Sequence, residues 1–234
     1  MYKGLNITPP FFEIGPKAFL YGKDALRLAQ HADEVSRKYD VQIIFTPQYV
    51  DIPLLASETE SILVFAQHMD FLPIGRGVGS VLPEAVKAAG AAGVLLNHAE
   101  KPLSMEAIEA TVRRADEVGL ASMVSAGTPE EVVKIAQMQP NIVLAESPAL
   151  IGVGKRAAND SAMISETNEL VWKTNPGIRV LHGAGISNGQ DVYNIILAGA
   201  QGTGSTSGIL RAPDPFQMLE EMIRCVRMAW DETH

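Results

Sequence analysis

Long apolar runs, cysteine pairs and clusters of basic residues are all missing from this chain of 234 residues. Nowhere do about 18 apolar residues follow one another, and the N-terminal segment has no apolar stretch of signal-peptide length, so we expect neither a membrane span nor a secretion signal. Cys225 is the single cysteine, which excludes an intrachain disulfide. These absences together favour a protein of the reducing cytoplasm.

The charge balance and the spacing of metal-binding residue types exclude two further classes of function. The net charge is −8 and the lysines and arginines are dispersed, whereas nucleic-acid binding depends on basic clusters that neutralise phosphates. The sequence also lacks a closely spaced pair of His or Cys ligands. We therefore expect no nucleic acid, no metal and no cofactor.

What the sequence does contain is an alternation of short apolar runs and longer amphipathic stretches. The runs are unpatterned, as expected for strands of a parallel sheet that is covered on both faces. Thr128 is expected to cap a helix that begins with Pro129 and two acids. The expected strands are 11–14, 41–45, 62–66, 93–96, 121–124, 142–145, 179–181 and 199–203. The expected helices are 23–39, 52–56, 83–89, 104–118, one from 129, 161–172, 187–197 and 215–230.

Eight strand–helix units in this length favour a closed (β/α)₈ barrel that forms a single domain over residues 1–234. Apolar residues make up 47% of the chain, which is enough for one large core. No low-complexity linker separates the units. A doubly wound open sheet is the competing architecture.

Three reactive side chains follow strands of this predicted barrel within one to three residues. Lys17 follows the first strand, His98 the fourth and Glu146 the sixth. Each of them alone has an ordinary interpretation as a surface charge, a helix cap or a turn residue. Because the carboxyl ends of the strands share one rim, where such barrels form their active sites, we expect the three to converge.

Two glycine-rich segments follow the last two strands, at residues 182–189 and 202–208. Glycines let backbone N–H groups approach an anion closely, and the helix that follows adds a favourable dipole. The loops after strands seven and eight are the usual phosphate site of such barrels. The sequence therefore predicts a small phosphorylated ligand.

Several segments, in the right order along nearly the whole chain, resemble the triosephosphate isomerase family in its archaeal form. Residues 94–100 resemble the segment around its electrophilic histidine, 146–155 its catalytic glutamate and mobile loop, and 183–187 its phosphate loop. Residues 65–70 and 79–86 are supporting matches. The resemblance implies an aldose–ketose isomerase of glycolysis that interconverts dihydroxyacetone phosphate and glyceraldehyde 3-phosphate through an enediolate.

The resemblance also implies roles for individual residues. Glu146 would be the base, His98 the neutral imidazole that polarises the carbonyl, and Lys17 the cation that binds substrate. Glu100 would orient Lys17 or His98, although a surface salt bridge is an equal alternative. Closure of the loop after Glu146 would exclude water. The substrate- and phosphate-binding positions would be Gly15, Ile151, Gly152, Gly185, Thr206 and Ser207.

The chain departs from the family pattern at positions that we expect to face the pocket. Gly15 stands where the family has Asn, Ala99 where it has Ser, and Ser147 where it has Pro. Ser125 replaces a common Cys, and Gly204 and Ser205 replace an apolar pair before Thr206, which takes an Ala position. Lost side-chain volume motivates a second hypothesis, an isomerase of another ketose phosphate such as a tetrulose phosphate.

Three other functions remain open at this point. The altered first-strand motif allows a non-catalytic phosphometabolite-binding barrel, and Lys17 allows a Schiff-base aldolase. A metal enzyme would need His68, His98 and His182 to converge. By resemblance we further expect a homodimer or homotetramer, with residues 71–79 as the interface, and an active-site lid as the alternative role of that segment.

Overall fold

Eight parallel strands close on themselves into a barrel. In the computed structural model, which describes residues 1–146 and 160–234, each strand pairs with the next and the last pairs with the first. Closure confirms the predicted (β/α)₈ barrel and is incompatible with a doubly wound open sheet. The strands are β1 (Phe11–Ile14), β2 (Gln42–Phe45), β3 (Leu63–Ala66), β4 (Gly93–Leu96), β5 (Ala121–Ala126), β6 (Ile142–Ala145), β7 (Arg179–His182) and β8 (Gly202–Gly204).

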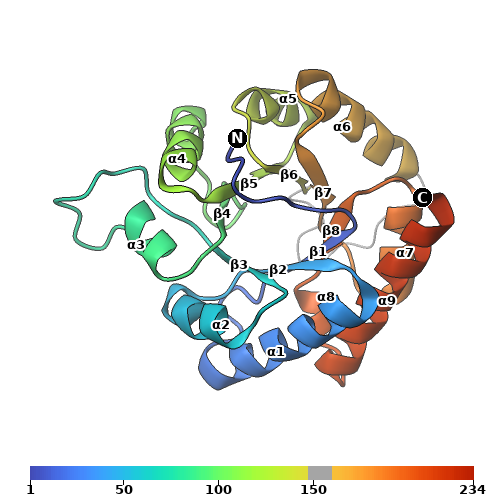
Figure 1. The fold of residues 1–234 in the computed structure, drawn as a ribbon. Helices are drawn as coiled ribbons and strands as arrows, with labels where there is room; N and C mark the ends of the chain where they lie inside the picture. Colours follow the sequence, from blue (N-terminus) through green and yellow to red (C-terminus); the bar gives the residue numbers. More distant parts are fainter. Residues whose placement is uncertain (147–159) are drawn as a thin grey trace.

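Helices surround the strands on the outside, as Figure 1 shows in a view along the barrel. They are α1 (Gly22–Tyr39), α2 (Ile52–Glu58), α3 (Pro83–Ala88), α4 (Met105–Val118), α5 (Pro129–Gln137), α6 (Asp160–Thr174), α7 (Gly189–Leu197), α8 (Ser207–Leu210) and α9 (Pro215–Thr233), with a 3₁₀ turn η1 (Tyr49–Asp51) before α2. Within the described residues, none of these helices has the length and apolarity that crossing a bilayer requires.

Alternation along each strand divides the apolar side chains between two cores. In β1, Phe12 and Ile14 pack in the layer between strands and helices, whereas Phe11 packs inside the barrel. Glu13 follows Phe11 by two residues, so its side chain also points inward, because successive side chains of a strand alternate between faces. The barrel interior is therefore filled by side chains, with one carboxyl among them near its rim.

Helix starts follow the capping chemistry of the sequence. The Thr128 hydroxyl accepts a hydrogen bond from the Glu131 N–H at 3.2 Å, and Pro129 occupies the first turn of α5 as predicted. Ser104 caps α4 in the same manner, by accepting from Ala107 N–H. Each cap satisfies an amide that the helix itself leaves without a partner.

Two expectations near the C-terminus were wrong. The predicted strand 199–203 is β8 at Gly202–Gly204, because Gly199 has a φ of +99° and its N–H donates to Ile196 in the turn that ends α7. The segment read as a continuous glycine- and serine-rich loop contains α8. Both errors arise because glycine-rich sequence does not reveal where a helix ends or restarts.

Asp33 ties α1 to the segment that leads into β3. Its Oδ1 accepts hydrogen bonds from the N–H groups of Glu60, Ser61 and Ile62 at 3.0, 2.6 and 3.1 Å, and Arg37 pairs with Oδ2. Burial alone would raise the pKa of this carboxyl, but the three amides and Arg37 hold it below its usual value. One side chain thus satisfies three backbone donors that no strand or helix pairs.

We expect Asp33→Ala to lower the free energy of unfolding by about 2 to 4 kcal/mol, because three amides lose their acceptor. Urea denaturation at pH 7 measures this difference. Asp33→Asn keeps one acceptor oxygen and should lose less, and Asp24→Ala at an exposed site of the same helix is the control. An unchanged urea midpoint for Asp33→Ala would contradict the assignment.

Candidate active site

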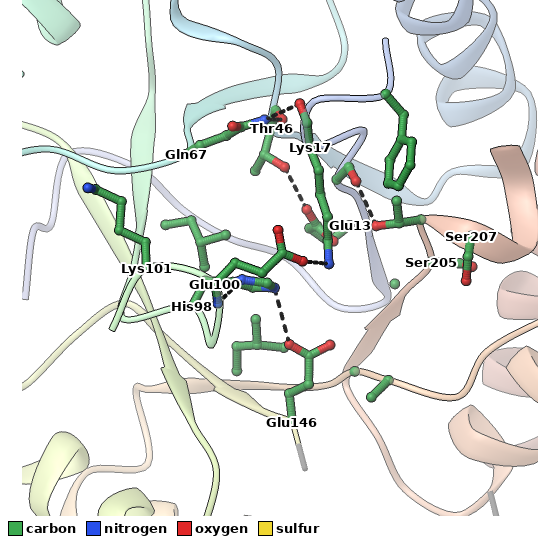
Figure 2. A pocket seen from close by; sticks show the side chains of 18 of the residues that line it. Glu13, Lys17, Thr46, Gln67, His98, Glu100, Lys101, Glu146, Ser205 and Ser207 are labelled. Atoms are coloured by element: carbon green, nitrogen blue, oxygen red, sulfur yellow. Dashed lines mark hydrogen bonds and ion pairs between the residues drawn. The ribbon is translucent and has the colours of Figure 1, made fainter. Parts of the chain in front are cut away.

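A cavity of about 610 Å³ opens at the carboxyl ends of the strands. Lys17, His98 and Glu146 all line it, although the first and the last are 129 positions apart in the sequence (Figure 2). Barrel closure brings them together because the loops after β1, β4 and β6 start from the same rim. The expected convergence of an amine, an imidazole and a carboxylate is therefore present in the geometry.

The other expected site residues divide into two groups. Gly15, Glu100, Gly185, Thr206 and Ser207 line the same cavity. Ile151 and Gly152, like the rest of the expected mobile loop and Ser147, lie outside the described residues.

A backbone hydrogen bond fixes the tautomer of His98. The N–H of Glu100 donates to His98 Nδ1 at 3.1 Å, so Nδ1 carries a lone pair and the ring proton of the neutral imidazole is on Nε2. The loop that makes this bond is itself held by Asn97, whose side chain accepts from Leu103 N–H and donates to Ser125 O, each at 2.9 Å. His98 therefore presents an N–H donor to the cavity.

Glu146 is the partner toward which that donor points. The distance from His98 Nε2 to Glu146 Oε2 is 3.7 Å, and both side chains are largely buried (Figure 2). Burial lowers the pKa of His98, and nearby Lys17 lowers it further against the opposing effect of Glu100. The imidazole is thus neutral at physiological pH, which suits a hydrogen-bond donor to a carbonyl oxygen rather than a proton store.

The side chain of Lys17 reaches across the cavity mouth to Glu100. The Lys17 Nζ to Glu100 Oε1 distance is 2.5 Å, and this bond is the main reason that the pKa of Glu100 is lowered. Glu100 thereby touches both groups it was expected to orient, Lys17 through its carboxylate and His98 through its N–H. Its carboxylate is also 60% exposed, so the ion pair with Lys17 contributes orientation more than stability.

Sequence reasoning missed the two amides that hold the backbone of Lys17. This residue has a φ of +52°, a left-handed conformation that a side chain disfavours. Its carbonyl accepts hydrogen bonds from Gln48 Nε2 at 2.7 Å and from Gln67 Nε2 at 2.9 Å. Gln67 belongs to a segment that supported the family resemblance, but nothing in the spacing indicates that it bonds to the first loop.

The loops after β7 and β8 form the other side of the cavity. Ala184 and Gly185 have φ values of +62° and +72°, and Ser207 begins α8. Lys17 and Arg211 also line the cavity, so positive charge is available to an anion there. Thr206 was expected to bind the phosphate, but its hydroxyl donates to Gly15 O at 2.6 Å. This hydrogen bond joins the loop after β8 to the loop after β1.

Glu13 is a cavity residue that the sequence analysis overlooked. Its carboxyl lines the cavity and accepts a hydrogen bond from Thr46 Oγ1 at 2.8 Å (Figure 2). Desolvation raises its pKa to about 7, opposed by the Thr46 bond, with Glu146 raising the pKa further and Lys17 lowering it. The available signal was a charged residue at an inward position of an otherwise apolar four-residue strand.

The departures from the family pattern do not all reach the cavity. Gly15, Gly204, Ser205 and Thr206 line it, as expected. Ala99 and Ser125 are described residues but are not part of the cavity wall, so these two substitutions do not enlarge it. The pocket-facing changes are therefore concentrated where β1 meets β8.

The three histidines considered as metal ligands have different partners. His68 Nε2 lies 3.3 Å from Asp70, and His182 Nε2 lies 2.9 Å from Asn168 Oδ1. Over residues 1–146 and 160–234, no group of three His, Cys, Asp or Glu side chains is placed to hold a metal ion. The geometry gives no support to the hypothesis of a three-histidine centre.

We expect Glu13 to make stability depend on pH. Its raised pKa means that the unfolded chain loses this proton near pH 4.5 and the folded protein near pH 7, so the folded state is weakened as pH rises between these values. The difference in unfolding free energy between Glu13→Gln and wild type should therefore shift in favour of the variant by on the order of 2 kcal/mol as the pH is raised from 5 to 8. Urea titrations at both pH values measure this; a gain that does not change with pH would contradict it, and exposed Glu109→Gln is the control.

Comparison with known proteins agrees with this geometry over nearly the whole chain. The family model described as triosephosphate isomerase matches residues 17–224. The triosephosphate isomerase of Methanosarcina barkeri is 38% identical over 220 residues, which cover 93% of this chain and 99% of that protein. Those of Methanobacterium bryantii and Methanothermus fervidus are 38% and 39% identical over 203 residues, covering 86% of this chain and 89% and 91% of theirs. The chain therefore belongs to the triosephosphate isomerase family.

Proposed function

We propose that this protein interconverts dihydroxyacetone phosphate and glyceraldehyde 3-phosphate. The observation that carries the proposal is the hydrogen bond from Glu100 N–H to His98 Nδ1, which leaves an Nε2–H donor facing the Glu146 carboxylate 3.7 Å away. A donor for a carbonyl oxygen beside a base for the adjacent carbon is what aldose–ketose isomerisation requires. The names of the relatives reported above support the same reaction.

The reaction begins when the substrate carbonyl accepts the hydrogen bond of His98 Nε2. Glu146 then removes a proton from the carbon next to the carbonyl, and the electron pair of that C–H bond forms the enediolate double bond while negative charge moves to the carbonyl oxygen. His98 donates to that oxygen and the Lys17 ammonium stabilises its charge. His98 gives its Nε2 proton to the former carbonyl oxygen and takes the proton of the hydroxyl on the neighbouring carbon, which becomes the new carbonyl. Glu146 returns its proton to the former carbonyl carbon, so no atom is gained or lost. This division between a glutamate and a neutral histidine is the one that triosephosphate isomerase exemplifies.

The phosphate of the substrate is proposed to bind at the loops after β7 and β8. Gly185 and Ser207 line that side of the cavity, and Arg211 adds a cation. We keep Ile151 and Gly152 as further phosphate-binding positions on the resemblance alone. The net charge of −8 does not prevent the protein from binding a phosphate, because positively charged side chains are concentrated locally in the cavity lining.

The engagement of Lys17 disfavours the aldolase hypothesis. A Schiff base requires an amine that is free to attack a carbonyl carbon, whereas Lys17 Nζ is engaged by Glu100 Oε1 at 2.5 Å. The presence of all three of Lys17, His98 and Glu146 in one cavity likewise favours catalysis over simple binding of a phosphometabolite.

We expect Glu146→Gln to lower kcat for dihydroxyacetone phosphate by on the order of 10³-fold, because the amide cannot accept the substrate proton. A coupled assay measures the rate, and NMR in D₂O follows deuterium entry at the carbon next to the carbonyl. Exposed Glu169→Gln on α6 is the matched control and should keep the wild-type rate. Equal, negligible rates for wild type and Glu146→Gln would favour the binding hypothesis, and borohydride trapping of substrate on Lys17 would favour the aldolase.

We also propose that the protein self-associates through the segment between β3 and α3. This segment projects from the barrel in Figure 1, and Phe71, Ile74 and Val78 are 52%, 73% and 109% exposed. Exposed apolar side chains gathered on one projecting loop are typical of a contact surface. A homodimer or a homotetramer would bury them.

We expect the double substitution Ile74→Asp and Val78→Asp to convert the oligomer to a monomer, since a buried charge opposes association. Light scattering after size exclusion measures the mass. Met228→Asp, at a 45% exposed apolar site on α9, is the control and should leave the mass unchanged. An unchanged mass for the double variant would refute the interface, and a raised KM with unchanged mass would instead assign the segment as a lid.

A further inference from the structure

A carboxyl stands beside the apolar side chains that line the cavity from the barrel interior. Leu95, Leu144 and Leu181 line the cavity from the barrel interior, and Glu13 contributes a carboxyl beside them. A carboxyl removed from water without full compensation weakens a protein, as the raised pKa of Glu13 reflects. Such a group is retained where it has a task that an aliphatic side chain cannot perform.

Two glycines make the room that this carboxyl occupies. A Cβ on Gly15 would lie 2.7 Å from Glu13 Oε1 and 3.2 Å from Thr46 Oγ1. A Cβ on Gly204 would lie 3.0 Å from Glu13 Oε2 and 2.7 Å from the Glu13 carbonyl. Both glycines are departures from the family pattern, and both lie against the Glu13 carboxyl at the β1–β8 junction.

The two oxygens of the carboxyl differ in their surroundings. Thr46 Oγ1 donates to Oε1, which fixes the side chain at the cavity floor. In the part of the chain that the structure describes, no group bonds to Oε2, and this atom is not among the fully buried polar atoms without a partner. Oε2 is therefore accessible from the cavity and able to bond a ligand.

The reacting atoms of a triose phosphate do not need this additional group. Dihydroxyacetone phosphate carries a carbonyl and one hydroxyl on the two reacting carbons, and the proposed roles of His98, Lys17 and Glu146 already serve these atoms. A hydroxyl on an added carbon would have no partner among those three. We infer that Glu13 binds such a hydroxyl and selects for a four-carbon ketose phosphate, an inference that rests on the isomerase function proposed above.

The groups proposed for proton transfer and the carboxyl proposed to recognise the extra hydroxyl come from different strands. His98 and Glu146 follow β4 and β6, whereas Glu13 lies on β1. We therefore expect substitutions at Glu13 to change the preference for substrate length more than the proton transfer.

The test compares dihydroxyacetone phosphate with the two enantiomers of erythrulose phosphate, each phosphorylated at either end. Deuterium exchange and isomer formation are followed by NMR, and kcat and KM are obtained for each substrate. The wild-type enzyme is expected to turn over at least one of the tetrulose phosphates. Glu13→Leu should lower the ratio of its kcat/KM to that of the triose at least about tenfold, mainly through KM, because the hydroxyl loses a hydrogen bond. Glu13→Gln keeps a hydrogen-bonding group and should recover part of the ratio.

Gly15→Ala gives an independent variant that leaves Glu13 in the sequence. Its methyl group would displace the Glu13 carboxyl, so the ratio of kcat/KM for the tetrulose phosphate to that for the triose should fall. In a Glu13→Ala background, Gly15→Ala should change this ratio little, because no carboxyl remains to be displaced. Exposed Glu109→Gln is the control for the loss of one charge. Glu13→Gln preserves the side-chain volume, so the comparison with wild type is still possible if Glu13→Leu does not fold.

Two outcomes overturn the inference while leaving the isomerase function intact. One is a wild-type enzyme that isomerises the triose pair and no tetrulose phosphate, and the other is an unchanged substrate ratio in Glu13→Leu and Glu13→Gln. A wild-type enzyme that acts on none of these sugar phosphates would instead overturn the proposed function itself.

Discussion

The pairing of β1 with β8 is the constraint on which the site depends. The register sets Phe11 opposite Gly202 and Glu13 opposite Gly204, and the contact continues past the strands through Ser205 N–H to Glu13 O and Thr206 Oγ1 to Gly15 O. A slip of one residue in this ladder would turn Glu13 to the helical layer and Phe12 to the interior. The same pairing closes the barrel, so the first loop with Lys17 and the last loops with Ser207 face one cavity.

Within that cavity, hydrogen bonds that involve the backbone orient the side chains of His98 and Lys17. The Glu100 amide keeps a lone pair on His98 Nδ1, and the Lys17 carbonyl is held by two glutamine amides in a conformation that a lysine disfavours. Two carboxyls and one ammonium then share a partly desolvated space, where their mutual effects are strong. The reactive groups are consequently oriented by the chain before any substrate arrives, which is the preorganisation that electrostatic catalysis requires.

The sequence was sufficient to predict the architecture and the convergence of Lys17, His98 and Glu146, because strand ends in a parallel barrel share one rim. The sequence was insufficient where a role depends on the direction in which a side chain points rather than on the place of the residue in the chain. Gln48 and Gln67 are ordinary polar residues until their amides are seen to meet the Lys17 carbonyl. Gly15 was interpreted as the loss of an amide, whereas its contacts show that it admits a carboxyl from two residues earlier. The Glu13 carboxyl lies against Gly15 because side chains alternate between the two faces of β1 and because Thr46 donates a hydrogen bond to the carboxyl. A comparison of single positions in the sequence reveals neither of these causes.

The coupling of Glu13 with Gly15 and Gly204 also explains why these departures belong together. A Cβ at position 15 would lie 2.7 Å from the Glu13 carboxyl, and a Cβ at position 204 would lie 3.0 Å from it and 2.7 Å from the Glu13 backbone carbonyl. The combination places a carboxyl at the rim, and Thr46 holds this carboxyl through a hydrogen bond of 2.8 Å. The exchange takes place on β1 and β8, and not on the strands that precede His98 and Glu146. The His98 and Glu146 side chains proposed for proton transfer thus follow β4 and β6, whereas the carboxyl proposed to recognise the carbon chain lies on β1 beside β8.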